Sequence, residues 1–397
     1  LRGMTKTRLP WWLQVTLVFL LGRAVSTVML LVLASQQAEN AWTGAQPSLW
    51  DFSTMWDGRW YNIIAETGYP HEIPYTEDGH VGENAWAFLP AYPAIVRGLM
   101  VITGLPWSIS GVLISVLFAL AASLVFYKIL IKHVPAQQAL FAIVLFAVSP
   151  VSPLFQLAYA ESMQLFLIAL VILLMQRRLY GWVIPVVIVL SLTRPGALAV
   201  ALAIGLHWIY RFAKRKRSRF PTRERVLLAV VALVAAGSGV AWMFIAGWVT
   251  GVPNAYLDTE LAWRSAYIGY QELIPFTPWI HAAQWWTTSF GYPELGGYIL
   301  LGALVLGFFV FLFTPAMKKL GVDVRFWLAS YALYLLAVFF PQSSTFRLLA
   351  PLFPALGAIA APKSKVYRVI MVVLFIVLQW GWLLICWRID GYDWSPP

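Results

Sequence analysis

Long apolar segments constrain this 397-residue chain more than any other feature. Hydrophobic residues make up 60% of the sequence and charged residues only 11%, whereas soluble domains carry about 25% charged residues. This composition excludes a disordered chain and a soluble protein with a single core. The apolar runs are continuous and do not alternate with polar residues, which argues against an outer-membrane barrel. The sequence therefore predicts an all-α polytopic membrane protein, residues 1–397 forming one integral-membrane domain.

Eleven apolar segments fit membrane-crossing helices, although some are shorter than the usual length of about 20 residues. Residues 86–103 are also apolar, but two prolines and Arg97 predict a surface-lying or re-entrant segment there. The predicted crossings are residues 11–34, 108–132, 136–150, 157–176, 180–195, 197–212, 226–250, 294–316, 325–341, 346–362 and 366–386.

Most of the 28 Lys and Arg residues fall on one side of this arrangement. The positive-inside rule assigns that side to the cytoplasm. The basic segment 211–225 then forms a cytoplasmic loop that contacts anionic lipid headgroups. Membrane topology thus explains the net charge of +11, and we expect no nucleic-acid partner. The opposite side holds two long segments, 35–107 and 251–293, whose Trp and Tyr residues favour the outer membrane interface.

The first chemistry-bearing motif begins at Trp56 and ends near Gly68. Its apolar residues recur at three- and four-residue spacings, which predicts a short helix lying on the membrane surface. Asp57 falls in the first turn, where the helix dipole favours a carboxylate. Such a carboxylate can accept a proton from a sugar hydroxyl. The alternative is that Thr54 and Asp57 only form a capping box.

Further candidates lie at predicted outer helix ends and in the two outer segments. Glu161, Arg194 and Arg347 are predicted to lie near membrane depth. Placing an ionisable group there costs free energy, so each one is by default a candidate functional residue. An arginine fork suits phosphate oxygens; the alternatives are snorkelling to headgroups or an internal ion pair with Glu161. Arg23, midway in the first crossing, is predicted to form a structural ion pair. His281 either contacts a donor phosphate or sugar, or lies at the interface without a role.

Several site types are disfavoured. His71 and His80 stand among acidic residues, but their spacing matches no metal-ligand pattern, so we expect a solvated loop there. The single cysteine, Cys386, excludes Cys-based zinc sites. No nucleotide-binding glycine pattern occurs.

Taken together, the motifs resemble the PIG-V-type mannosyltransferases of the GT-C superfamily of glycosyltransferases, in a bacterial form. The resemblance is carried by Trp-Asp-Gly-Arg-Trp-Tyr at 56–61, Gly-Tyr at 68–69 and Ala-Phe-Leu-Pro-Ala-Tyr-Pro at 87–93. Shorter blocks at 159–162, 193–195 and 346–347 are similar to later blocks of that family.

The resemblance implies a GT-C fold of about eleven crossings in the plasma membrane, with the active site on the extracytoplasmic face. It implies an inverting transfer of mannose from polyprenyl-phosphate-mannose to a glycolipid or cell-envelope glycan, with Asp57 as general base. Two alternatives stay open: another polyprenyl-phosphate sugar such as arabinofuranose or glucose, or a transporter or flippase of lipid-linked sugars. No metal ligands are predicted, but a divalent metal requirement is left open. The candidate substrate-binding residues are Arg59, Trp60, Tyr61, Glu83, Tyr92, Tyr159, Glu161, Arg194, His281 and Arg347.

Overall fold

The computed structural model describes residues 9–271, 274–389 and 396–397, so Arg2, Lys6 and Arg8 lie outside the described residues. Within those ranges the chain is helical, and its strand-like pairing is limited to an isolated bridge between Tyr75 and Val81. Five helices among the described residues are long and apolar enough to cross a membrane. These are α1 (Trp11–Gln36), α5 (Trp107–Leu130), α10 (Thr222–Thr250), α14 (Glu294–Phe311) and α19 (Lys365–Cys386). The predicted all-helical, multi-pass class is confirmed.

The long helices carry large apolar side chains on their outer surfaces. Leu21 of α1 is 68% exposed, Trp248 of α10 is 84% exposed and Leu306 of α14 is 66% exposed. A helix that is apolar on both its inward and outward faces suits a lipid environment, because water would penalise the outward face. The surface composition therefore agrees with the membrane class.

Five of the six remaining predicted crossings coincide with shorter helices. The longest of them has 17 residues and the shortest has nine, below the length of about 20 that spans the hydrocarbon core. The total of eleven crossings accordingly stays a prediction. The shorter helices are α6 (Ala136–Ala147), α7 (Glu161–Gln176), α8 (Val183–Ser191) after the 3-10 turn η3 (Tyr180–Trp182), α9 (Ala197–Ala213) and α16 (Val322–Val338).

The predicted crossing at 346–362 is wrong as a single helix. Pro351 and Pro354 lack the amide hydrogens of a continuous helix and clash with preceding carbonyl groups. The segment is divided instead into α17 (Thr345–Leu348), the 3-10 helix η4 (Ala350–Ala355) and α18 (Leu356–Ile359). Arg347 lies in α17, which Leu349 joins directly to η4.

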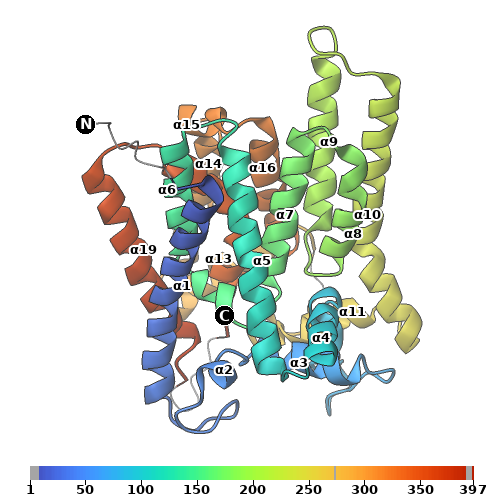
Figure 1. Ribbon diagram of the computed structural model, residues 1–397. Coiled ribbons are helices and arrows are strands. Elements are labelled where there is room, and N and C mark those ends of the chain that lie inside the picture. Colours follow the sequence, from blue (N-terminus) through green and yellow to red (C-terminus); the bar gives the residue numbers. More distant parts are fainter. Residues whose placement is uncertain (1–8, 272–273, 390–395) are drawn as a thin grey trace, which may run out of the picture.

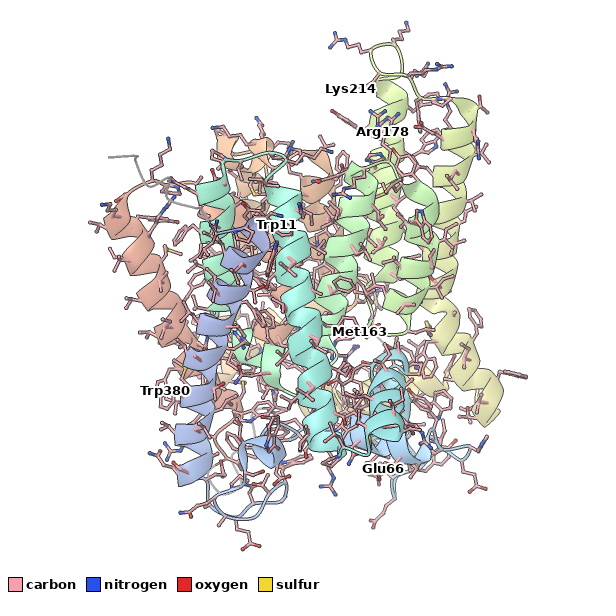
Figure 2. The ribbon with its side chains drawn as sticks, in the orientation of Figure 1. Trp11, Glu66, Met163, Arg178, Lys214 and Trp380 are labelled. Atoms are coloured by element: carbon pink, nitrogen blue, oxygen red, sulfur yellow. The ribbon has the colours of Figure 1, made fainter. Side chains whose placement is uncertain are left out.

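Several short helices of the two predicted outer segments gather at one end of the bundle, here called the motif end (Figure 1). The segment predicted to lie on the surface contains α4, which has 13 residues and ends at Gly104 in the left-handed conformation. The connection between α9 and α10 lies at the opposite end. Figure 2 accordingly shows Lys214 and Glu66 far apart. The elements of the motif end include α2 (Leu49–Phe52), α3 (Asp57–Thr67), η1 (Ala85–Ala87), α4 (Ala91–Thr103) and α11 (Ala255–Ala262).

The other short elements connect the long helices. They are η2 (Ser152–Gln156), α12 (Ser265–Ile268), α13 (Pro278–Ser289) and α15 (Pro315–Lys319).

Arg23 does not form the predicted ion pair. Its guanidinium donates to the carbonyl oxygens of Ala147 at 2.7 Å and Ser152 at 2.6 Å, and to the side chain of Gln156 at 3.2 Å. These carbonyls stand where α6 ends and η2 begins, and carbonyl groups at a helix end lack partners within the helix. Arg23 therefore ties α1 to the chain segment that leads into α7.

Candidate active site

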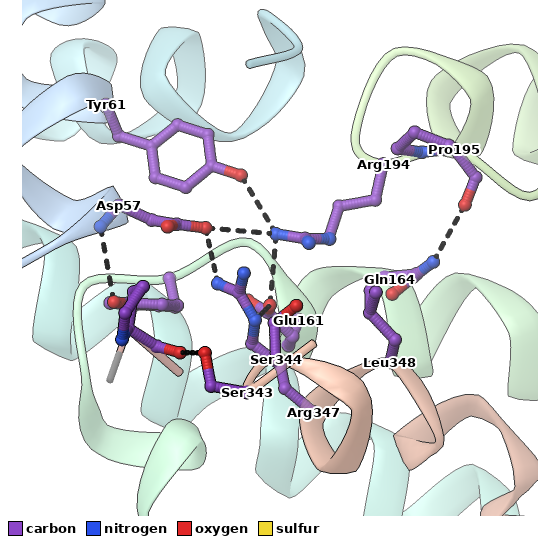
Figure 3. Close-up of polar contacts among 12 residues, drawn as sticks. Asp57, Tyr61, Glu161, Gln164, Arg194, Pro195, Ser343, Ser344, Arg347 and Leu348 are labelled. Carbon is purple, nitrogen blue, oxygen red and sulfur yellow. Dashed lines mark hydrogen bonds and ion pairs between the residues drawn. The ribbon is translucent and has the colours of Figure 1, made fainter. Parts of the chain in front are cut away.

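Four charged side chains from four separate segments converge on one cluster (Figure 3). Asp57 is the first residue of α3, and Glu161 is the first residue of α7. Arg194 lies in the connection between α8 and α9, and Arg347 lies in α17. We call these four residues the charge cluster. The structure thus brings together the predicted base, the predicted phosphate-binding arginines and the second carboxylate.

Both arginines pair with both carboxylates. Arg347 Nη1 donates to Asp57 Oδ2, and Arg194 Nη1 lies 3.5 Å from the same oxygen. Arg194 Nη1 is also 3.0 Å from Glu161 Oε1, and Arg347 Nε is 3.4 Å from that oxygen. The internal ion pair with Glu161 is therefore present, and Asp57 joins it.

The two carboxylates differ in how far they are buried. The side chain of Asp57 is 16% exposed, and that of Glu161 is 2% exposed. Asp57 also belongs to a short helix at the motif end, whereas Glu161 begins a helix within the bundle. Asp57 is consequently the more exposed of the two carboxylates.

A strained turn places Asp57 at the start of α3. Trp56 has φ +57° and ψ −122°, a conformation that side-chain-bearing residues rarely adopt, and Gly58 N–H donates to Met55 O at 3.2 Å across the turn. Such a conformation costs about 1–3 kcal/mol and persists only where the surroundings hold it. Here Trp56 Nε1 donates to the carbonyl oxygen of Cys386 at 3.0 Å.

The capping alternative for Asp57 does not describe this turn. The residue at the N-cap of α3 is Trp56, and no side chain accepts a hydrogen bond there. The Thr54 hydroxyl donates instead to the carbonyl oxygen of Asp51. The Asp57 carboxylate faces the two arginines.

Two predicted tyrosines line the charge cluster. The Tyr159 hydroxyl accepts from the backbone N–H of Asp57 at 3.2 Å, and its ring lies 5.5 Å from the guanidinium carbon of Arg347. Arg194 Nη1 donates to the Tyr61 hydroxyl at 3.4 Å. Burial raises the pKa of the Tyr61 phenol although Arg194 acts to lower it, so this phenol stays neutral.

Tyr92 and Trp60 lie one layer behind these tyrosines. The Tyr92 hydroxyl bonds to the carbonyl oxygen of Gly111 at 2.9 Å, and its ring meets Tyr61 edge-on at 5.3 Å. Trp60 stacks on Phe88 with ring centroids 5.7 Å apart. Both residues support the α3 face that carries Tyr61.

Arg59, Glu83 and His281 are not brought into the charge cluster. Arg59 is exposed and lies over the ring of Trp42 at 5.6 Å. Glu83 as a whole residue is exposed to solvent. Partial desolvation of its carboxyl group nevertheless raises the pKa of that group. His281 lies in α13. Within the described part of the chain, none of the three bonds to the four charged side chains, and their substrate-binding role stays a prediction.

Two residues that no sequence pattern indicated, Gln164 and Tyr331, hold the segments that carry the arginines. Gln164 Nε2 donates to the carbonyl oxygen of Pro195 at 3.2 Å, next to Arg194. The Tyr331 hydroxyl donates to the carbonyl oxygen of Leu348 at 2.9 Å, next to Arg347. Both side chains act on backbone carbonyls far away in the sequence. No local motif points to such contacts.

The charge cluster does not fit a divalent metal ion. No group of three or more His, Cys, Asp or Glu side chains suited to a metal gathers among residues 9–271, 274–389 and 396–397. The two carboxylates of the cluster face guanidinium groups, and these cations would repel a metal ion from the same oxygens. We therefore derive no step through a metal.

The chain matches no known family model and no curated protein sequence. Among solved structures it is similar to ArnT from Cupriavidus metallidurans bound to undecaprenyl phosphate, with 14% identity and a TM-score of 0.49. It is also similar to the Archaeoglobus fulgidus oligosaccharyltransferase in complex with zinc and sulfate, with 16% identity and a TM-score of 0.48.

These matches cover 86% and 96% of this chain, but only 59% and 54% of the respective solved chains. The chain thus spans less than two thirds of the length of either solved protein. At these identities and TM-scores, the similarity does not extend to activity or substrate.

Proposed function

We propose that this chain is an inverting glycosyltransferase with the GT-C fold, which uses a polyprenyl-phosphate sugar at the extracytoplasmic face of the plasma membrane. The observation that carries the proposal is the charge cluster: its more exposed carboxylate, Asp57, faces two arginines at a single position. A hydroxyl acceptor needs a base, and a phosphate leaving group needs cations. The cluster holds both.

The proposed step is a direct displacement. The Asp57 carboxylate takes the proton of the acceptor hydroxyl while that oxygen forms a bond to the anomeric carbon of the donor. The bond from the anomeric carbon to the phosphate oxygen breaks, and its electron pair leaves with the phosphate. Attack from the face opposite the leaving group inverts the anomeric centre, so a β-linked donor yields an α-linked product.

Arg194 and Arg347 bind the phosphate in this proposal. Negative charge on the leaving phosphate grows as the bond breaks, so guanidinium groups stabilise the transition state more than the bound donor. Phosphate is already a good leaving group, and the step needs no strong general acid. Tyr61 and Tyr159 line the same position and stay neutral partners.

The donor sugar in this proposal is mannose, on the strength of the PIG-V-like motif at 56–61, and the acceptor is a lipid-linked or cell-envelope glycan. Arabinofuranose and glucose donors use the same chemistry. A panel of labelled polyprenyl-phosphate sugars separates them, because only the true donor transfers its label.

The test replaces the base in the full chain. In membranes supplied with labelled polyprenyl-phosphate-mannose, we expect Asp57→Asn to reduce transfer by at least about 100-fold, since general-base catalysis contributes about 10²–10⁴-fold. Asp51→Asn is the matched control, because Asp51 is an exposed carboxylate on α2 that interacts with Ser48. Undiminished transfer by folded Asp57→Asn protein would remove Asp57 from this role.

A further inference from the structure

The charge cluster holds its base in a paired state. Arg347 donates to Asp57 Oδ2, and Arg194 lies 3.5 Å from that same oxygen. Both guanidinium groups thus contact the oxygen atom that would receive the proton of an acceptor hydroxyl. The arginines that suit a donor phosphate are therefore also the groups that hinder proton transfer to Asp57.

Arg347 contacts both carboxylates, Asp57 through a hydrogen bond and Glu161 through an ion pair alone. Its Nη1 group contacts Asp57, whereas its Nε group lies 3.4 Å from Glu161 Oε1. A guanidinium presents donors along two edges of one plane. Its terminal nitrogen can hence change acceptor while Nε stays beside Glu161.

Glu161 is the fixed member of the cluster. Its side chain is 2% exposed, and it begins α7, which packs along α5 inside the bundle. Both of its carboxylate oxygens are buried and neither has a hydrogen-bond partner among the described residues, so Glu161 holds the two arginines by charge attraction alone. Asp57, by comparison, is 16% exposed on a short helix at the motif end. A ligand entering from that end meets Asp57 before it meets Glu161.

Resting on the proposed function, we infer that the donor phosphate displaces Asp57 from the two arginines, and that Glu161 is the positioning residue that retains them during this exchange. The phosphate oxygens take the place of Asp57 Oδ2 on Arg347 Nη1 and Arg194 Nη1. Asp57 then faces the acceptor hydroxyl without its cationic partners. The base is released only when a donor is bound, which prevents an unproductive encounter with the acceptor alone.

The two carboxylates then have opposite effects on phosphate binding, which a simple charge effect does not produce. Removing the Asp57 charge removes an internal competitor, so binding of a lipid phosphate tightens. Removing the Glu161 charge releases the arginines from their anchor, so binding weakens. If both carboxylates merely contributed negative potential, either removal would tighten binding.

The experiment measures the affinity of undecaprenyl phosphate for the purified full chain in nanodiscs. We expect Asp57→Asn to bind about tenfold more tightly than the wild type, and Glu161→Gln about tenfold more weakly, since a tenfold change corresponds to about 1.4 kcal/mol. Glu66→Gln is the matched control, because Glu66 is an exposed carboxylate on the same helix α3. In turnover, Glu161→Gln should raise KM for the donor more than it lowers kcat.

Equal or weaker binding by Asp57→Asn overturns the displacement, and tighter binding by Glu161→Gln overturns its positioning role. Melting temperatures verify that each variant is folded; if Glu161→Gln does not fold, the comparison of Asp57→Asn with the wild type decides the displacement alone. Absence of binding by the wild type overturns the proposed function itself. Wild-type binding with no gain in Asp57→Asn overturns only this inference.

Discussion

At the scale of single residues, Arg347 is the side chain on which the chemistry of the site depends most. It is 7% exposed, pairs with both carboxylates and lies beside the ring of Tyr159. A lysine has the same charge but a single nitrogen, so it cannot serve two carboxylates along two edges as a guanidinium does. The planar shape of the group therefore contributes in addition to its charge.

We expect Arg347→Ala to lower kcat/KM for the donor by about 10- to 150-fold, because a hydrogen bond to a charged group contributes about 1.5–3 kcal/mol. Arg347→Lys should recover only part of this loss. The measurement is donor-dependent transfer in membranes at equal protein level. Arg215→Ala, in the basic loop at the opposite end, is the control. Full activity in Arg347→Lys would show that charge alone suffices.

At the scale of elements, the close contact between α1 and α6 positions the chain that carries Tyr159 and Glu161. A Cβ atom on Gly22 would lie 2.5 Å from the carbonyl oxygen and 2.8 Å from the Cβ atom of Ala147. The neighbouring residue Arg23 bonds to that same carbonyl group. Helix α1 thus fixes the end of α6, and through η2 it fixes the approach to α7.

We expect Gly22→Ala to destabilise the protein by about 1–3 kcal/mol, because the added methyl group forces two helix backbones apart. Gly205→Ala in α9 is the matched control, since no atom lies within 4 Å of the Cβ position there. In an exposed helix interior, alanine is favoured over glycine by about 1 kcal/mol. Thermal unfolding in detergent should show a lower midpoint for Gly22→Ala only. A midpoint equal to the wild type would contradict the close contact.

At the scale of the whole molecule, the basic loop and the candidate site lie toward opposite ends of the bundle. The basic loop with Lys214 lies at one end, and α3 with Glu66 lies at the other (Figure 2). The positive-inside rule predicts that the basic end faces the cytoplasm. The charge cluster, which includes the first residue of α3, then belongs to the extracytoplasmic half.

Cysteine labelling tests this sidedness. The single native cysteine, Cys386, is buried, whereas Lys214 and Glu66 are exposed. In intact cells we expect a membrane-impermeant maleimide to label Glu66→Cys but not Lys214→Cys, and permeabilised cells should show both. The unaltered chain, with Cys386 alone, gives the background. Labelling of Lys214→Cys in intact cells would show that the orientation in the membrane is the reverse of the predicted one.

The sequence by itself determined the helical membrane class and several members of the candidate site. Each apolar residue favours lipid over water largely independently of its neighbours. The summed preference along a segment is therefore sufficient to predict a membrane-crossing helix. Ionisable residues at predicted helix ends stand out for the same reason, because each one is costly there. Glu161, Arg194 and Arg347 were identified in this way, and Asp57 was identified from its place in the motif at 56–61.

Only the tertiary structure decided which of these residues meet. The ion pair between Arg347 and Asp57 joins positions 290 residues apart, and such a contact depends on how helices pack, which local patterns do not specify. The carbonyl partners of Arg23 and the supporting role of Tyr331 arise from the same long-range packing, whereas the break at Pro351 follows from the proline itself. Arg59 shares the motif of Asp57 yet lies over Trp42, since neighbours on a helix point to different faces.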